Sequence, residues 1–209
     1  MNSDYKTVKI ESSDEFTEKR SRFIGYVKPV KTEQEAVDFI NSLRSKHWDA
    51  RHNVYAYSLR EGNIKRYSDD GEPSGTAGMP VLDVITKNEV YDVCVVVTRY
   101  FGGVLLGTGG LVRAYSQGAK IALEAGQVVK MESCLLCSLK CSYNQYGKIS
   151  SLIPELGGVI DDSAFEADVS LKFHIKPGCF DALNKKLADI TSGEIQANSD
   201  GEEFFMTEI

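Results

Sequence analysis

The chain has 209 residues, a length that allows one large domain or two modest ones, each with its own core. Apolar residues make up 42% and charged residues 26%, as in ordinary globular proteins, and no apolar run approaches the roughly 20 residues of a membrane-spanning helix. The net charge of −6 argues against a protein that is basic throughout.

The charge is unevenly divided along the chain. Residues 1–133 hold 18 Lys and Arg and 18 Asp and Glu, whereas residues 134–209 hold 6 and 12. The neutral first part can still present a local basic patch. The acidic second part is a poor surface for unspecific binding to nucleic acid, because the neutralisation of phosphates needs lysine and arginine.

Residues 1–9 are polar and lack the apolar segment of a secretion signal, so a cytoplasmic location is expected. Five cysteines, an odd number, are therefore expected to be reduced thiols. Cys134 and Cys137 form C-x-x-C, but residues 135, 137, 139 and 141 alternate like one face of a strand, which buries thiols as small apolar groups. No further ligand pair completes a zinc site, and we predict neither a metal nor a cofactor.

The first predicted elements alternate between strand and helix. A strand is expected over Ser21–Pro29, and a helix begins at Thr32, where Glu35 three residues on completes a capping box. Strands at Asn53–Leu59 and Ile64–Tyr67 follow, joined by a turn at residues 62–63. A polar loop over residues 68–78 comes next.

The remaining elements of the first part surround a buried strand. Pro80–Ile85 fits a helix or a short strand, and Val93–Thr98, apolar except for its last residue, predicts a strand buried on both faces. A helix is expected over Leu111–Ala125, with Gly126 as a left-handed cap. Val128–Ser133 fits a short strand or a linker, and we place a domain boundary near residue 133.

From residue 134 the pattern restarts with the order β-α-β-β-α-β, the split β-α-β or ferredoxin-like layout. The predicted strands are Leu135–Ser142, Val159–Ser163, Glu166–Ile175 and Glu194–Ala197, and the predicted helices are Gln145–Leu156 and Phe180–Ile190. The fold class is therefore α+β, with domains at residues 1–133 and 134–209.

The most informative stretch is the glycine-rich junction between the buried strand and the helix after it. Between Arg99-Tyr100 and Arg113 lie five glycines, at positions Gly102, Gly103, Gly107, Gly109 and Gly110. Free amide groups at a helix start beside arginine suit an anion, although glycines also serve close packing alone, and both interpretations are open. Neither the dinucleotide motif nor the P-loop is present, since Val112 replaces the third glycine of the first and Thr108 the lysine of the second.

Arg113 lies in the first turn of the predicted helix, where a cation opposes the helix dipole. Unless a carboxylate such as Asp69, Asp70 or Glu72 pairs with it, an anionic ligand explains Arg113 more easily.

Two further polar clusters precede the junction: His52-Asn53, and the loop that contains Asp69, Asp70, Glu72, Ser74 and Thr76. A histidine with carboxylates can form an acid–base pair, and the three carboxylates can hold a hard cation. The alternative is turn chemistry, in which aspartate and serine bond their own backbone. The serine-hydrolase motif G-x-S-x-G is absent, because Ser74 stands one place too late.

These three stretches, His52-Asn53, residues 68–78 and residues 99–115, together resemble the YigZ/IMPACT family of the bacterial two-domain type. The resemblance is strong over about residues 15–130 and extends through the remainder by the order of elements. It implies an N-terminal domain similar to the second domain of ribosomal protein S5 and a ferredoxin-like C-terminal domain similar to those of elongation factor G.

Both folds recur in translation proteins and can bind RNA. Eukaryotic IMPACT proteins restrain the starvation-responsive control of translation initiation through protein partners, and they carry a different N-terminal partner-binding domain that is not expected here. We therefore expect a cytoplasmic, non-catalytic factor that regulates translation, with RNA or ribosome-associated proteins as partners, no membrane and no specificity for DNA. The expected ligand- or anion-binding residues are His52, Asn53, Asp70, Glu72, Ser74, Thr76, Arg99, Tyr100, Gly102, Gly103, Gly107, Gly109, Gly110 and Arg113.

Two other functions are open. The first is an enzyme on a phosphorylated small molecule, with Gly107–Gly110 holding the phosphate and Asp69, Asp70 or Glu72 holding Mg²⁺. The second is a protein-docking module in which the acidic C-terminal domain engages a basic partner.

Overall fold

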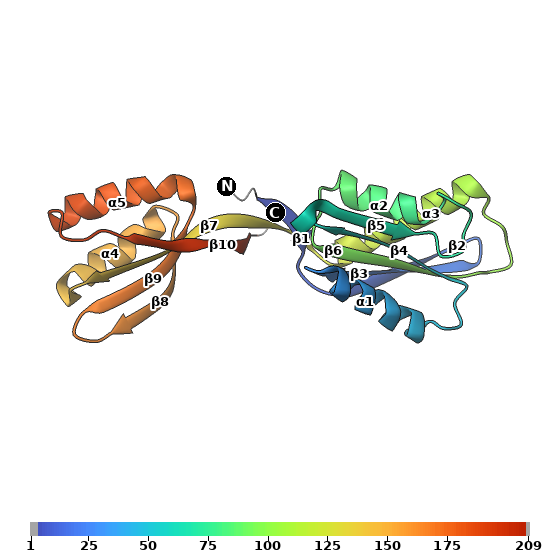
Figure 1. Cartoon of the computed structure of the whole chain (residues 1–209), viewed down its shortest axis with the longest axis horizontal. Coiled ribbons are helices and arrows are strands. Elements are labelled where there is room, and N and C mark those ends of the chain that lie inside the picture. The colour runs from blue at the N-terminus through green and yellow to red at the C-terminus, as the bar shows by residue number, and fades with distance from the viewer. Residues whose placement is uncertain (1–3, 208–209) are drawn as a thin grey trace. The chain divides into compact units, whose positions relative to one another are not determined.

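The computed structural model describes residues 4–207, which form two compact units. One unit is Tyr5–Lys130, and the other is Met131–Thr207 together with Asp4. Of the predicted domains 1–133 and 134–209, residues 1–3 and residues 208–209 lie outside the described part. Each unit has its own sheet and helices (Figure 1).

The unit Tyr5–Lys130 is built on a five-stranded antiparallel sheet. The strands lie in the order β2 (Ser12–Glu18), β3 (Ser21–Pro29), β6 (Val93–Tyr100), β4 (His52–Leu59) and β5 (Ile64–Ser68). In the central strand β6, Val95 and Val97 enter one core and Cys94 and Val96 enter another on the opposite face. The prediction of a strand buried on both faces is confirmed, because helices cover both sides of the sheet.

Helix α1 (Glu33–Lys46) covers one face, while α2 (Gly78–Lys87) and α3 (Thr108–Ala125) lie together on the other (Figure 1). The predicted start of α1 is confirmed, since the Thr32 hydroxyl accepts a hydrogen bond from the amide of Glu35 at 3.2 Å. The Glu35 carboxylate accepts from the amide of Lys31 rather than from that of Thr32. Side chains at the start of α1 thus provide the hydrogen bonds that cap this end of the helix.

Glycines let α3 lie directly on the sheet. A Cβ atom at Gly25 of β3 would stand 2.1 Å from the carbonyl oxygen of Gly118, and one at Gly118 would stand 2.8 Å from a methyl group of Val97. No side chain fits between the helix and the two strands. The close contact fixes α3, and therefore fixes where its first turn lies relative to the end of β6.

Several element boundaries differ from the predictions. Strand β1 (Tyr5–Val8), which pairs with β7, and strand β2 were not predicted; β2 is polar except for Phe16, so its sequence shows no apolar alternation. The ambiguous segment after the polar loop is the helix α2. Helix α3 begins three residues earlier than predicted, because glycines at its start concealed the helical pattern.

Gly126 does not have the predicted left-handed conformation. Its φ is −74°, and the positive φ of 57° belongs to Gln127. A Cβ atom at Gly126 would stand 2.6 Å from a methyl group of Val27, so close packing accounts for the glycine.

The second unit has the ferredoxin-like topology that the sequence predicted. Its elements are β7 (Val128–Cys141), α4 (Tyr143–Glu155), β8 (Val159–Phe165), β9 (Val169–Ile175), α5 (Pro177–Thr191) and β10 (Asn198–Thr207). The strand order is β10-β7-β9-β8, and alternate residues of β7 and β9 pack with both helices in one core. Residues 128–141 form one continuous strand, where a break was predicted.

The predicted strand Glu194–Ala197 is wrong. Ile195 and Ala197 are buried, which produced the apolar alternation, but their amides donate to side chains of α5, Thr191 and Asn184. The segment is an extended connection, and the strand β10 starts at Asn198 in a polar sequence that gave no signal.

Two cysteines of β7, Cys137 and Cys141, lie where the alternation placed them. Cys137 and Cys141 belong to the core of the second unit, and burial raises the pKa of Cys137 to about 11. All five cysteines are unpaired. Between residues 4 and 207, no helix has the length and apolar character needed to cross a membrane.

Candidate functional site

The end of β6, the loop after it and the start of α3 line an open cavity of about 460 Å³, together with residues 51–52 and 71–73; it is here called the β6–α3 cavity. Its charged lining residues are Arg51, His52, Glu72 and Arg99. The rest of the lining is made by Gly71, Pro73, Phe101, Leu105, Leu106, Gly107, Thr108 and Leu111. Three segments that are distant in the sequence therefore meet in one concavity.

A buried ion pair lies under this cavity. The Glu72 carboxylate accepts hydrogen bonds from Arg99 Nη1 at 2.6 Å and from the Tyr115 hydroxyl at 2.7 Å, and the side chains of Glu72 and Arg99 are 5% and 6% exposed. Burial, together with the charge of Glu72, raises the pKa of Tyr115, so its hydroxyl remains protonated and donates. Arg99 Nε is buried without a hydrogen-bond partner. The charge of Arg99, which was predicted to bind an anion, is thus largely neutralised by Glu72.

His52 lies directly across from Arg99 in the register between β4 and β6. Its Nδ1 stands 2.8 Å from the backbone carbonyl oxygen of Asp70, which can only accept, so Nδ1 carries a proton. Nε2 faces the Glu72 carboxylate at 3.7 Å. The Asp70 carbonyl thereby fixes the orientation and the tautomer of His52.

The three carboxylates of the polar loop have separate partners. Asp69 accepts from the amides of residues 75, 77 and 78 and so caps the start of α2. Asp70 accepts from Arg44 and from the amide of Asn53. Because Glu72 is held by Arg99 and Tyr115, the three do not converge on one cation. In the described part of the chain, no three His, Cys, Asp or Glu side chains are grouped to hold a metal.

Several predicted site residues have structural contacts instead of facing the cavity. The Asn53 side chain accepts from Thr98, and the Thr76 hydroxyl donates to the carbonyl of Pro73. Ser74 is exposed and lines neither of the two hollows described in this unit. Thr76 thus follows the turn-chemistry interpretation of the loop over residues 68–78, whereas Asn53 belongs to β4 and bonds across to β6.

Tyr100 belongs to a directed chain of hydrogen bonds on the α1 side of the sheet. Its hydroxyl donates to Asp49 at 3.0 Å and accepts from His47 Nδ1 at 2.9 Å. His47 Nε2 therefore accepts from the hydroxyl of Tyr26, at 2.7 Å. Burial, and then the charge of Lys46, lower the pKa of His47, so the ring is held neutral.

This lowered pKa predicts how stability depends on pH. The unfolded chain binds a proton at His47 near pH 6.5, whereas the folded unit resists it, so the contribution is present above pH 6.5 and is lost as the pH falls. We expect the wild type to lose more unfolding free energy between pH 7.5 and 5.5 than the His47→Gln variant. Hydrogen exchange of β6 amides at both values measures this; equal losses would show that His47 does not contribute.

The glycines of the junction divide by role. The amide of Gly102 donates to Ser21, and a Cβ atom there would overlap the backbone of Arg20, so this glycine serves packing. Gly107 has a φ of +73° and precedes α3 without a side-chain cap, so the first amides of the helix are left without a capping side chain beside the cavity. A Cβ atom at Gly103 or Gly109 would meet no other atom within 4 Å, so neither glycine is explained by close packing. A Cβ atom at Gly110 would stand 2.9 Å from Leu106 Cβ.

Arg113 does not lie with His52, Glu72 and Arg99. It lines a second hollow, between α2, α3 and β2, that shares only Leu106 with the β6–α3 cavity, and of the other predicted residues Gly110 lines the same hollow as Arg113. Conversely, Arg51 and Tyr115 belong to the site although neither was predicted. Arg51 directly precedes His52, and Tyr115 is two residues beyond Arg113; both are visible only as sequence neighbours of predicted residues.

Fold and site together define a two-domain α+β protein whose first unit has an arginine-lined cavity at the start of a helix. The model of the Impact N-terminal domain matches residues 19–123, and that of a domain of unknown function (DUF1949) matches residues 139–194. The chain belongs to the IMPACT family.

The bacterial relatives match most of the chain, and the eukaryotic ones match about half of it. The IMPACT family member YvyE of Bacillus subtilis is 37% identical over 91% of this chain and 88% of its own length, and YigZ of Escherichia coli is 36% identical over 85% and 89%. A solved structure titled a hypothetical protein is 32% identical, with a TM-score of 0.60, over 95% of this chain and 98% of that one. The Protein IMPACT homolog of Dictyostelium discoideum is 42% identical over 44% of this chain and 27% of its own length.

Proposed function

We propose that the unit Tyr5–Lys130 binds single-stranded RNA at the β6–α3 cavity and that the protein regulates translation in the cytoplasm through this binding. The observation that carries the proposal is the grouping of Arg51, the exposed ring of Phe101 and the uncapped start of α3 around one cavity. A phosphate can bind to the Arg51 guanidinium and to the amides at the start of α3, and a base can stack on the Phe101 ring.

The charges around the cavity favour a phosphate. Because Glu72 neutralises Arg99, the cation that faces solvent is Arg51, whose guanidinium lies 5.9 Å from the centre of the Phe101 ring. The amides at the start of α3 add a partial positive charge without a side chain. Leu105, 81% exposed, extends the apolar surface on the same loop.

The link to translation rests on the family. The relatives include proteins named IMPACT from Xenopus and IMPACT homologs from yeast and Dictyostelium, and eukaryotic IMPACT proteins act on translation initiation. A protein that binds RNA exposed during translation acts on the same process.

Arg51→Ala is expected to weaken binding of a labelled single-stranded RNA about tenfold, the effect of losing one charged contact with phosphate. Fluorescence anisotropy over a series of salt concentrations measures it, and the slope of log K against log salt should become shallower by about 0.7. Arg66→Ala on β5 is the matched control, because it removes the same charge from an exposed position that does not line the cavity. Equal affinities of the Arg51 and Arg66 variants would overturn the proposed site.

A phosphorylated small molecule is the second candidate for the same cavity. It is favoured by the combination of an uncapped helix start and the buried, unpartnered Nε of Arg99. If a mononucleotide displaces the RNA at micromolar concentration, the small molecule is the better description. If only RNA of several nucleotides competes with the labelled RNA, the cavity binds the polymer rather than a small molecule.

A further inference from the structure

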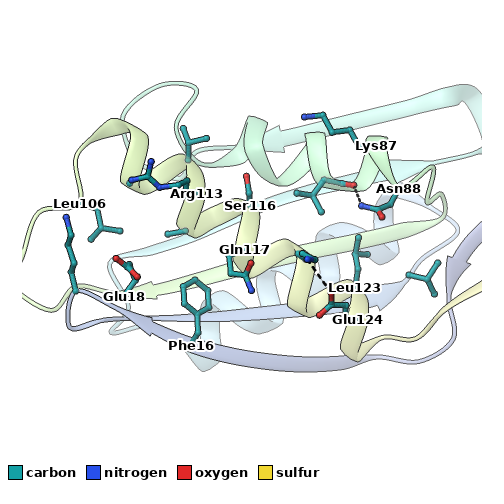
Figure 2. Close-up of a pocket in the computed structure, with 17 residues that line it drawn as sticks. Phe16, Glu18, Lys87, Asn88, Leu106, Arg113, Ser116, Gln117, Leu123 and Glu124 are labelled. Atoms are coloured by element: carbon teal, nitrogen blue, oxygen red, sulfur yellow. Dashed lines mark hydrogen bonds and ion pairs between the residues drawn. The ribbon is translucent and has the colours of Figure 1, made fainter.

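The second hollow of the unit Tyr5–Lys130 is a groove of about 750 Å³ between α2, α3 and β2, here called the α2–α3 groove (Figure 2). We propose that it is a docking site for an acidic amphipathic helix of a partner protein. This proposal does not depend on RNA binding, because the groove and the β6–α3 cavity share only Leu106.

One side of α3 forms the length of the groove. Arg113, Gln117, Lys120 and Glu124 follow one another at intervals of three and four residues, so they lie along one stripe of the helix. Ser116 lies beside this stripe, and Figure 2 shows Arg113, Ser116, Gln117 and Glu124 along α3. The stripe spans about 16 Å at 1.5 Å per residue, which matches about three turns of a second helix laid alongside. The groove therefore has the length of a helical segment.

The floor of the groove is apolar. Phe16 reaches it from β2, Val84 from α2 and Val128 from β7, and all three are only partly buried against the core. Val112, on the same lining, is 37% exposed. Such a floor takes the apolar side of a helix, as in helix-in-groove recognition, and offers nothing to a sugar–phosphate backbone.

The rim is predominantly basic. Lys19, Lys87 and Arg113 line the groove, and in residues 4–207 none of them has an ion pair or a side-chain hydrogen bond. Lys120 pairs with Glu124 at 3.9 Å, and Glu18 is the remaining acid on the lining. Three unpaired cations against one unpaired acid favour an acidic partner. Glu18 and Glu124 repel a polyanion such as RNA, because every one of its phosphates is negative. A peptide helix can instead place neutral or basic side chains opposite these two glutamates.

The probe is a synthetic peptide of about 14 residues, with leucines spaced three and four apart and glutamates on the flanks. Two matched peptides have the same leucines with lysine flanks, or the same composition in scrambled order. Anisotropy with the full chain measures affinity, and amide chemical shifts show which residues contact the peptide. We expect the acidic peptide to bind at least about tenfold more tightly than either matched peptide.

Variants of the groove test the placement. Arg113→Glu reverses a rim charge and Val112→Asp places a charge on the apolar lining, and each is expected to weaken the acidic peptide at least about tenfold. Arg66→Glu, outside the groove, is the control for charge. Equal binding of the three peptides, or equal effects of the Arg113 and Arg66 variants, would overturn the proposal.

RNA is the competing occupant. If Arg113→Glu weakens RNA binding as strongly as Arg51→Ala does, the groove belongs to the RNA surface and the docking proposal fails. If Arg113→Glu abolishes peptide binding while RNA affinity changes only as with Arg66→Glu, the docking proposal is supported, whatever the outcome of the Arg51 experiment.

Discussion

Glu72→Gln is expected to lower the free energy of unfolding of the unit Tyr5–Lys130 by about 3 kcal/mol, the usual effect of leaving one member of a buried ion pair without its partner. Glutamine keeps the shape of the side chain and still accepts from Tyr115, so the change isolates the charge. The Arg99 guanidinium then remains almost fully buried with no carboxylate to balance it. Hydrogen exchange of β6 amides measures the loss, and β9 amides in the second unit are an internal reference.

The exposed pair between Arg22 and Glu15 provides the matched control. Both side chains are about half exposed and water screens their charges, so Glu15→Gln should cost far less than Glu72→Gln. The double variant Glu72→Gln with Arg99→Met should be at least as stable as Glu72→Gln alone, because no buried charge remains. A loss for Glu72→Gln as small as that for Glu15→Gln would mean that water screens the pair.

Gly25→Ala is expected to destabilise the same unit by at least about 3 kcal/mol, at the upper end of what overpacking costs. The added methyl group would stand 2.1 Å from the carbonyl oxygen of Gly118. A backbone atom in the middle of a helix cannot rotate away, so α3 must shift from the sheet. The same hydrogen-exchange measurement on β6 reports the effect.

Gly109→Ala is the control for this packing prediction. It lies in the first turn of α3, and a Cβ atom there meets nothing within 4 Å. Its effect should lie within about 1 kcal/mol, the range of helix propensity between glycine and alanine. Similar losses for the Gly25 and Gly109 variants would contradict the close contact between α3 and β3.

The site differs from its sequence-based prediction mainly in where the free positive charge lies. Arg99, which was expected to bind an anion, and Arg51 both line the cavity, but Arg99 is buried and paired with Glu72, whereas Arg51 is exposed. The carboxylates of the polar loop were open to an acid–base or cation-binding interpretation, and two of them, Asp69 and Asp70, instead hold backbone amides. The anion-binding proposal therefore depends on Arg51 and the start of α3.

Sequence alone determined the α+β class, the order of most elements and the meeting of strand β6 with helix α3 at a glycine-rich junction. These features follow from local signals: the apolar run of β6, the cap at Thr32 and the alternation in β7 each act within a few neighbouring residues. Where the local signal was absent, as in the polar strands β2 and β10, the elements were missed, because their pairing partners stabilise them.

Only the tertiary structure decided which polar residues share a cavity. The register between β4 and β6 places His52 beside Arg99, and the loop before α2 brings Glu72 to both. Arg113 is separated from them because α3 begins at Thr108, which places Arg113 in the second turn of the helix, where it lines the α2–α3 groove. Ion pairs and cavities depend on contacts between distant segments, and no spacing along the chain specifies those distances.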